Sequence, residues 1–286
     1  MTSALRPSWK TIAERVSQSQ RIYLCFDLDG TLASIRRRPT LVTLAATTRR
    51  RLVQLRRHSR VRLMFVSGRG LADLKRVVGL KGVYYVGNHG LEIEGPDFSY
   101  VPASARRSRT RLLRLAAYLV CHLPPIPGAW MEEKGLTLSF HLREVRSTDR
   151  PALTRALWRL LNAAIKQGWV QLTRGRLVWE VRPAVDWDKG QAVRWLYQRL
   201  NDRNAKSPLI FYAGDDVTDE AAFRAVNQLR GISILAGRNR LMQHTAAAYR
   251  LRGPADVQVW LREILSALDK RRGKQKTQLV VTGGAA

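Results

Sequence analysis

Acidic residues stand directly after two of the apolar, strand-like runs of this chain. Asp27 and Asp29 close the run that begins at Arg21, and a second acidic group at 215–219 follows the run over 209–213. Ligands of open parallel sheets bind beyond the carboxyl ends of the strands, where the strand order reverses. We therefore expect both acidic groups at one site, provided that the first and fourth strands are neighbours in the sheet.

Carboxylates that converge in this way repel one another and require a cation nearby. The acidic side chains concerned are those of Asp27, Asp29, Asp215, Asp216 and Asp219. An all-oxygen set of ligands suits Mg²⁺, which commonly takes one or two carboxylates, several waters and a substrate phosphate. The sequence thus predicts a magnesium site beside these strand ends.

Four short motifs resemble those of the haloacid dehalogenase (HAD) superfamily of phosphotransferases, and they occur in its order. Residues 26–32 (FDLDGTL) resemble the first motif and residues 66–69 (VSGR) the second. Lys189 resembles the third motif and residues 214–219 (GDDVTD) the fourth. A single Asp-x-Asp pair would be weak evidence, because acidic turns are common and mostly have a structural role. Four motifs in the expected order, each at the end of a strand or helix, favour a phosphatase.

The resemblance implies a role for each motif. Asp27 would attack phosphorus to form an aspartyl-phosphate, and Asp29 would protonate the leaving alkoxide and then deprotonate the attacking water. Lys189 would hold the transferring phosphoryl oxygens. The remaining expectations are Gly30, Thr31, Ser67 and Gly68 around the phosphate, Asp27, Asp215 and the backbone carbonyl of Asp29 on Mg²⁺, and Asp216 and Asp219 orienting metal-bound water and Lys189.

Helices and strands alternate around these motifs. Besides the run from Arg21, we predict strands over 61–66, 83–86, 209–213 and 232–235, and helices over 43–58, 71–78, 188–200, 217–226 and 255–268. Near-continuous apolar strands that alternate with helices are typical of a buried parallel sheet. The predicted fold class is therefore α/β, with a Rossmann-like HAD core formed by residues 21–98 and 184–269.

The alternation breaks between residues 99 and 183. Here we predict helices over 104–122 and 150–167, strands over 129–132 and 136–141, and a hairpin that pairs 170–173 with 177–182. Helices mixed with antiparallel strands indicate an α+β cap inserted into the core. Because an aspartate nucleophile does not choose its leaving group, we expect this cap to select the substrate.

The most specific resemblance is to the trehalose-6-phosphate phosphatase family, and it covers about residues 22–268. The segments that carry it are 87–90 (GNHG), 132–134 (EEK), 140–143 (FHLR), 180–190 (EVRPAVDWDKG) and 214–220 (GDDVTDE). It implies hydrolysis of trehalose 6-phosphate to trehalose and phosphate in trehalose biosynthesis, with Glu132, Lys134 and Glu180 binding the sugar. Arg69, Asn88 and Arg143 are further expected substrate contacts, and Leu142 stands where the family usually has tyrosine.

Two other functions stay open at this point. A related HAD phosphatase for sucrose phosphate, mannosyl-glycerate phosphate or another sugar phosphate would keep the core motifs and differ at the cap. A basic nucleic-acid-binding protein on a phosphatase scaffold would suit the net charge of +28, which comes from 50 Lys and Arg against 22 Asp and Glu. The basic residues are scattered over several segments, however, without a base-reading helix, an RNA-binding aromatic motif or a zinc finger. We therefore expect a solvated basic surface and no nucleic-acid partner.

The chain ends and the cysteines favour a cytoplasmic protein. Residues 1–20 lack the apolar block of a secretory signal and indicate a polar lead-in, while residues 270–286 are basic, then Gly/Ala-rich, and predicted to be disordered. The two cysteines, Cys25 and Cys121, form neither a disulfide framework nor a zinc site. No run approaches the roughly 18 apolar residues of a membrane helix. We expect a monomer whose partners are a small-molecule sugar phosphate and, from the resemblance, a trehalose-6-phosphate synthase.

Overall fold

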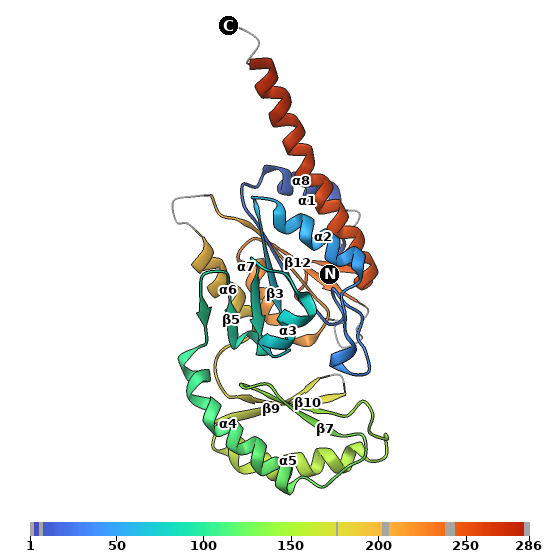
Figure 1. The fold of residues 1–286 in the computed structure, drawn as a ribbon, viewed down its shortest axis with the longest axis vertical. Helices are drawn as coiled ribbons and strands as arrows, with labels where there is room; N and C mark the ends of the chain where they lie inside the picture. Colours follow the sequence, from blue (N-terminus) through green and yellow to red (C-terminus); the bar gives the residue numbers. More distant parts are fainter. Residues whose placement is uncertain (1–2, 6–7, 176, 202–205, 238–243, 283–286) are drawn as a thin grey trace.

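The structure is a computed structural model of the chain, and it describes residues 3–5, 8–175, 177–201, 206–237 and 244–282, with side chains as far as Asp269. A core built around one large sheet carries a cap built around a smaller sheet (Figure 1). The cap sheet lies between the core and the two long cap helices. The predicted fold class, a parallel-sheet α/β core with an inserted α+β cap, is therefore confirmed.

The core sheet places the two acidic groups side by side. Within the described residues its strand order is β1-β13-β12-β11-β2-β3-β4-β5-β6. The strands are β1 (Ser3–Ala4), β2 (Ile22–Phe26), β3 (Val61–Val66), β4 (Tyr84–Gly87), β5 (Glu92–Glu94), β6 (Ser99–Tyr100), β11 (Leu209–Gly214), β12 (Ile232–Ala236) and β13 (Tyr249–Leu251). Neighbours pair in parallel except β4 with β5 and β5 with β6. Because β2 pairs with β11, the loops that follow these two strands meet at one edge of the sheet.

Helices cover both faces of the core sheet, so the central strands are buried on both sides. The helices are α1 (Trp9–Gln18), α2 (Ala46–Arg57), α3 (Leu71–Val78) and α8 (Pro254–Thr282) on one face, and α6 (Lys189–Leu200) and α7 (Glu220–Gln228) on the other. Short 3₁₀ turns are η1 (Pro39–Leu41), η2 (Asn88–Gly90) and η3 (Val217–Asp219). On β2, Ile22 and Leu24 pack toward the first face, whereas Tyr23 and Cys25 pack toward the second. This alternation in a wholly apolar strand is expected of a central parallel strand, and it anchors the loop that carries Asp27.

The cap has one apolar and one polar sheet face. It contains α4 (Ala103–His122), α5 (Arg150–Lys166) and the antiparallel strands β7 (Trp130–Glu133), β8 (Leu138–His141), β10 (Val178–Pro183) and β9 (Val170–Gly175), in that sheet order. Leu138, Phe140 and Val181 are buried among the apolar side chains of α4 and α5. Residues of the opposite parity, among them Glu132 and Glu180, lie on the face toward the core (Figure 1).

Three predicted boundaries are corrected by the structure. The prediction that residues 1–20 form a polar lead-in is wrong for the described part of that segment. There β1 pairs with β13, and α1 buries Ile12 and Val16 in the core. Disorder from residue 270 onward is wrong as far as Thr282, because the backbone of α8 continues to that residue; 283–286 lie outside the described residues. The cap begins later than residue 99, because β6 pairs with β5 at the edge of the core sheet.

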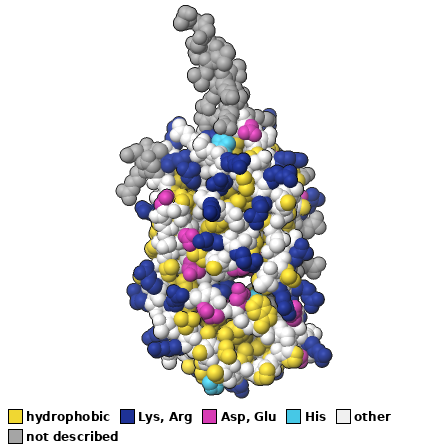
Figure 2. Space-filling view, in the orientation of Figure 1, with side chains coloured by type: hydrophobic (Ala, Val, Ile, Leu, Met, Phe, Trp, Pro, Cys, Tyr) yellow, Lys and Arg dark blue, Asp and Glu magenta, His cyan; other side chains and the backbone are white. Residues whose placement is uncertain are grey.

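Lys and Arg side chains are dispersed over the face of the protein seen in Figure 2. Figure 2 shows Lys and Arg side chains dispersed over the visible face, between apolar and acidic ones, without a continuous basic stripe. This distribution agrees with the interpretation of the +28 charge as a solvated surface. Among the described residues, no helix combines the length and the apolar character needed to traverse a bilayer.

Candidate active site

Asp27 lies immediately after β2 and is 5% exposed. Its backbone N–H donates to the carbonyl of Ala213 at 2.8 Å, which ties this loop to the end of β11. Gly30 has a φ of +89°, and a Cβ there would lie only 2.0 Å from Asp215 Oδ2. Glycine at this position therefore allows both the turn and the close approach of the Asp27 and Asp215 loops.

Lys189 supplies the positive charge of this cluster. It is the first residue of α6, and the side chain of Asp188 caps that helix by accepting from the N–H of Gln191 at 2.8 Å. Lys189 Nζ donates to Asp27 Oδ1 at 2.9 Å and to Asp219 Oδ1 at 2.8 Å. Burial alone would lower the pKa of Lys189, but the carboxylates of Asp219 and Asp27 outweigh it and raise this pKa. Lys189 is therefore a fixed cation in contact with Asp27.

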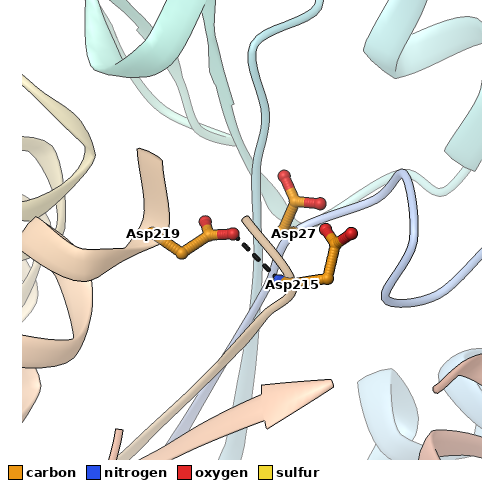
Figure 3. Close-up of side chains that lie close together, drawn as sticks. All are labelled: Asp27, Asp215 and Asp219. Atoms are coloured by element: carbon orange, nitrogen blue, oxygen red, sulfur yellow. Dashed lines mark hydrogen bonds between the residues drawn. The ribbon is translucent and has the colours of Figure 1, made fainter. Parts of the chain in front are cut away.

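Asp219 organises the loop after β11. Its Oδ1 also accepts from the hydroxyl of Tyr212 at 2.6 Å. Its Oδ2 accepts from the backbone N–H groups of Asp215 at 3.0 Å and Asp216 at 3.1 Å, and Figure 3 shows the first of these bonds. Both oxygens of Asp219 are thus engaged by the protein, which is the geometry needed to orient Lys189.

The carboxylates of this cluster fit a divalent metal ion. Asp27, Asp215 and Asp219 each place an oxygen within 4.8 Å of the others (Figure 3). Burial raises the pKa of Asp27 to about 8, more than Lys189 lowers it, and the charge of Asp219 adds to the increase. Burial, followed by the charge of Asp27, raises the pKa of Asp215 to about 9. Because Asp219 is already engaged, Asp27 and Asp215 are the two carboxylates that an oxygen-seeking cation would stabilise.

The predicted phosphate-binding residues lie on the loops that follow the paired strands β2 and β3. Ser67 is buried, and Gly68 lies so close to His89 that a Cβ would be 2.4 Å from the imidazole. Thr31 is buried too, and its Oγ1 has no hydrogen-bond partner among the described residues. Since buried hydroxyls normally have a partner, this atom fits an oxygen supplied by a ligand.

Arg69 holds the carboxylate of Asp29 with two hydrogen bonds. Its Nε donates to Asp29 Oδ2 at 2.6 Å, and its Nη2 donates to Asp29 Oδ1 at 2.8 Å. Its Nη1 donates to the carbonyl of Pro39 at 3.1 Å and to the carboxylate of Asp73. The guanidinium of Arg69 is therefore engaged with the side chain of Asp29, and its direct contact with substrate stays a prediction.

Glu180, Lys134 and His89 link the cap to the core directly over the Ser67–Gly68 loop. Lys134 Nζ donates to Glu180 Oε1 at 2.7 Å and to the carbonyl of Gly68 at 2.8 Å. His89 Nε2 lies 2.5 Å from Glu180 Oε2. Burial would raise the pKa of Glu180, but His89 and Lys134 outweigh it and hold this pKa well below its usual range. Burial lowers the pKa of His89 to about 4, so a neutral imidazole donates to an ionised Glu180 at neutral pH.

Glu132 belongs to the same polar cap face. Its Oε2 lies 2.9 Å from His141 Nε2, and the ring of Trp130 stacks on His141 with centroids 3.8 Å apart. Burial would raise the pKa of Glu132, but the hydrogen bond from His141 and the charge of Lys134 lower it. Glu132 is therefore an ionised acceptor held in one orientation.

Asn88 and Arg143, two of the predicted substrate contacts, both bind other parts of the protein. Asn88 Nδ2 donates to Glu92 Oε2 at 2.6 Å and to the carbonyl of Lys134 at 2.9 Å. Because a carboxamide has two N–H donors, none is left for a ligand, and the Asn88 amide instead ties the core to the cap. Arg143 donates to the carbonyl of Arg36, so it bridges the cap to the loop after β2.

Two residues of the site were not predicted. Tyr212 lies within the apolar run of β11, where the sequence indicates only a buried aromatic residue, although its hydroxyl positions Asp219. Asp73 lies four residues after Arg69 and pairs with it, a spacing that could have been recognised as a helical ion pair. Both residues act on the site by fixing another side chain.

Comparisons with known proteins agree with this geometry. The sequence model of the trehalose-phosphatase family matches residues 25–255. The chain is 37% identical over 245 residues to a trehalose-phosphate phosphatase of Mycobacterium marinum, covering 85% of this chain and 61% of the relative. A trehalose-phosphate phosphatase of Mycobacterium ulcerans is 36% identical over the same length and the same shares. The fold resembles the C-terminal domain of the C. albicans trehalose-6-phosphate phosphatase, with a TM-score of 0.79 and 22% identity over 93% of this chain and 98% of that one. The chain therefore spans 61% of the length of the two mycobacterial relatives.

Proposed function

Because the chain belongs to the trehalose-phosphatase family, we propose that it hydrolyses trehalose 6-phosphate to trehalose and phosphate. The observation that carries this proposal is the contact of Lys134 with both Glu180 and the Gly68 carbonyl, which sets the polar cap face over the expected phosphate-binding loop. A phosphate bound beside Asp27 would thus present its sugar to the cap. This function also requires a trehalose-6-phosphate synthase to supply the ester.

Asp27 is the nucleophile in this proposal. One of its carboxylate oxygens attacks phosphorus, a new bond to Asp27 forms, and the bond from phosphorus to the sugar oxygen breaks. Asp29, protonated and released from Arg69, gives its proton to that sugar oxygen. Water then attacks phosphorus, Asp29 takes the proton from the water, and the Asp27 carboxylate is restored as phosphate leaves.

The surrounding residues hold the transferring group. Lys189 contacts Asp27 and can share its remaining donor with a phosphoryl oxygen, while Ser67 and the Thr31 hydroxyl lie on the loops beside Asp27. These donors are fixed before the substrate arrives, so they stabilise the developing charge without reorganising. Asp216 and Asp219 position the loop that carries Asp215.

We propose Mg²⁺ as the resident cation, held by the carboxylates of Asp27 and Asp215 and by the backbone carbonyl of Asp29. The raised pKa values of Asp27 and Asp215 support this assignment. They indicate that the positive charge near these two buried carboxylates is too small to stabilise both in their ionised forms. When bound, Mg²⁺ neutralises charge on the phosphoryl oxygens and favours the ionised Asp27.

Mg²⁺ should stabilise the enzyme in the absence of substrate. At about 100 times its dissociation constant it would add about 2.7 kcal/mol, which corresponds to a Tm increase of about 5–10 °C for a chain of this size. Asp215→Asn removes a ligand and should abolish this shift, whereas Asp97→Asn, on the exposed turn before β6, should retain it. Thermal melts with Mg²⁺ and with EDTA measure the difference. An equal Mg²⁺ shift in Asp215→Asn would contradict the assigned site.

Phosphate release from a panel of esters tests the substrate assignment. We expect the highest kcat/KM with trehalose 6-phosphate, compared with sucrose 6-phosphate and glucose 6-phosphate, each with Mg²⁺ and with EDTA. The reason is that Glu132, Lys134 and Glu180 form a polar surface above the phosphate site that can contact a second sugar ring. A higher kcat/KM with another ester would support phosphatase activity but contradict trehalose 6-phosphate as the preferred substrate. No phosphate release from any of the three esters would contradict the proposed activity.

A further inference from the structure

Arg182 of β10 is a half-buried arginine whose guanidinium makes no hydrogen bond or ion pair with any residue that the structure describes. Its Nε is buried without a hydrogen-bond partner, and no hydrogen bond or ion pair joins the Arg182 side chain to any other described residue. Burial lowers the pKa of Arg182, and the more distant charges of Glu180 and Asp188 offset this effect only in part. The buried Nε of Arg182 thus lacks a direct contact with an acceptor among the described residues.

Arg69 shows how this protein normally accommodates a buried arginine. The Arg69 guanidinium has two carboxylates, Asp29 and Asp73, and the carbonyl of Pro39 as partners. With those partners the pKa of Arg69 is raised although burial alone would lower it. The pKa of Arg182 moves in the opposite direction, because no described residue binds its guanidinium in this way. Since buried donors are nearly always paired, the Nε–H of Arg182, which is buried without a partner among the described residues, fits an acceptor supplied by a ligand.

The position of Arg182 indicates where that partner lies. It stands two residues after Glu180 on β10, so both side chains leave the same, core-facing side of the cap sheet. The charge of Arg182 also contributes to lowering the pKa of His89, which places it near the His89–Glu180 pair. Arg182 therefore borders the same space between cap and core as the acceptors of the polar cap face.

We propose that Arg182 donates hydrogen bonds to the hydroxyl oxygens of the sugar leaving group, an inference that rests on the proposed phosphatase function. Carboxylates such as Glu180 and Glu132 accept from sugar hydroxyls, and Arg182 provides the complementary donors on the same surface. Lys189, Ser67 and Thr31 of the core bind the phosphate in the proposed function, whereas Arg182 belongs to the cap. Arg182 therefore contacts the sugar, the part of the ester that faces the cap.

The test is Arg182→Met, which keeps the length of the side chain and removes every donor. KM for trehalose 6-phosphate should rise about 10- to 100-fold, the range expected for lost hydrogen bonds from a charged group. The kcat/KM for p-nitrophenyl phosphate, which has no sugar, should stay nearly unchanged. The Tm of the ligand-free variant should stay equal or increase, because an unpaired buried charge is replaced by an apolar side chain. Arg182→Lys should give a KM between those of the wild type and Arg182→Met.

Arg155→Met is the matched control, because Arg155 is an exposed arginine on α5, across the cap sheet from the core. It should leave both KM values unchanged. An unchanged KM for trehalose 6-phosphate in Arg182→Met would overturn the inference, as would a fall in Tm with equal losses on both esters. Equal losses on both esters at an unchanged Tm would indicate a phosphate contact and would overturn the sugar contact too. If the wild type hydrolyses p-nitrophenyl phosphate but not trehalose 6-phosphate, the proposed function fails, and the sugar contact fails with it.

Discussion

Asp27→Asn should lower phosphate release from trehalose 6-phosphate by a factor on the order of 10⁴ or more. The carboxamide has nearly the shape of the carboxylate, so the packing of Asp27 at the end of β2 is retained while its nucleophilic oxygen is lost. The measurement is kcat at saturating substrate and Mg²⁺, with circular dichroism to establish that the variant is folded.

Asp97→Asn provides the control for the nucleophile, because it makes the same chemical change on an exposed turn. It should keep the wild-type kcat. If Asp27→Asn retained more than about one hundredth of the wild-type rate while Asp97→Asn was unaffected, another group would have to be the nucleophile.

Lys189→Met should have the largest effect on stability. It would leave Asp27 and Asp219 buried without the cation that contacts both of them, and breaking a buried ion pair in this way costs about 3–5 kcal/mol. For a chain of this size the loss corresponds to a Tm about 10 °C lower. Activity should fall by a factor of about 10³ or more as well, because Lys189 contacts the nucleophile. Thermal melts without substrate and phosphate-release assays measure the two effects.

Lys75→Met is the control that shows how much the Tm falls when a lysine in a surface ion pair is lost. Lys75 pairs with Glu94 on the surface, where both side chains are more than a third exposed, and such a pair contributes about 0–1 kcal/mol. Equal melting temperatures for Lys189→Met and Lys75→Met would show that the buried cluster does not depend on Lys189.

The sequence is sufficient to predict the central sheet and the acids at its edge. β2, β3 and β11 are continuous apolar runs that end at turn or acidic residues, and this pattern arises because both faces of a central strand are buried. The meeting of Asp27 with Asp215 follows from the parallel pairing of β2 with β11. These features depend on local sequence and on general rules of sheet topology, so one sequence determines them.

Peripheral elements are harder to predict because they bury little. The α1 helix buries only Ile12 and Val16, too few positions for a clear helical period. β5 and β13 have three residues each, and a run that short does not distinguish a strand from a loop. The helical continuation of α8 beyond Leu268 is rich in Lys, Arg and Gln, which favour helix but lack the apolar pattern that predicts one.

Side-chain pairs between distant segments could not be predicted at all. Arg69 lies 40 residues from Asp29, and the sequence does not reveal that its guanidinium binds that carboxylate. The full engagement of Asn88 likewise depends on Thr137 and Lys134 of the cap. Arg182, within a recognisable motif, becomes informative only when the structure shows that its guanidinium has no partner among the described residues.

Chemical trapping of the phosphorylated residue tests the central claim most directly. The enzyme is mixed briefly with trehalose 6-phosphate and Mg²⁺, quenched in acid and reduced with borohydride, which converts an aspartyl-phosphate to homoserine. Peptide mass spectrometry then locates the modified residue. We predict homoserine at position 27 in samples given trehalose 6-phosphate and an unmodified Asp27 in samples given trehalose. Phosphate release without modification of Asp27, or with modification of another carboxylate, would contradict the proposed mechanism.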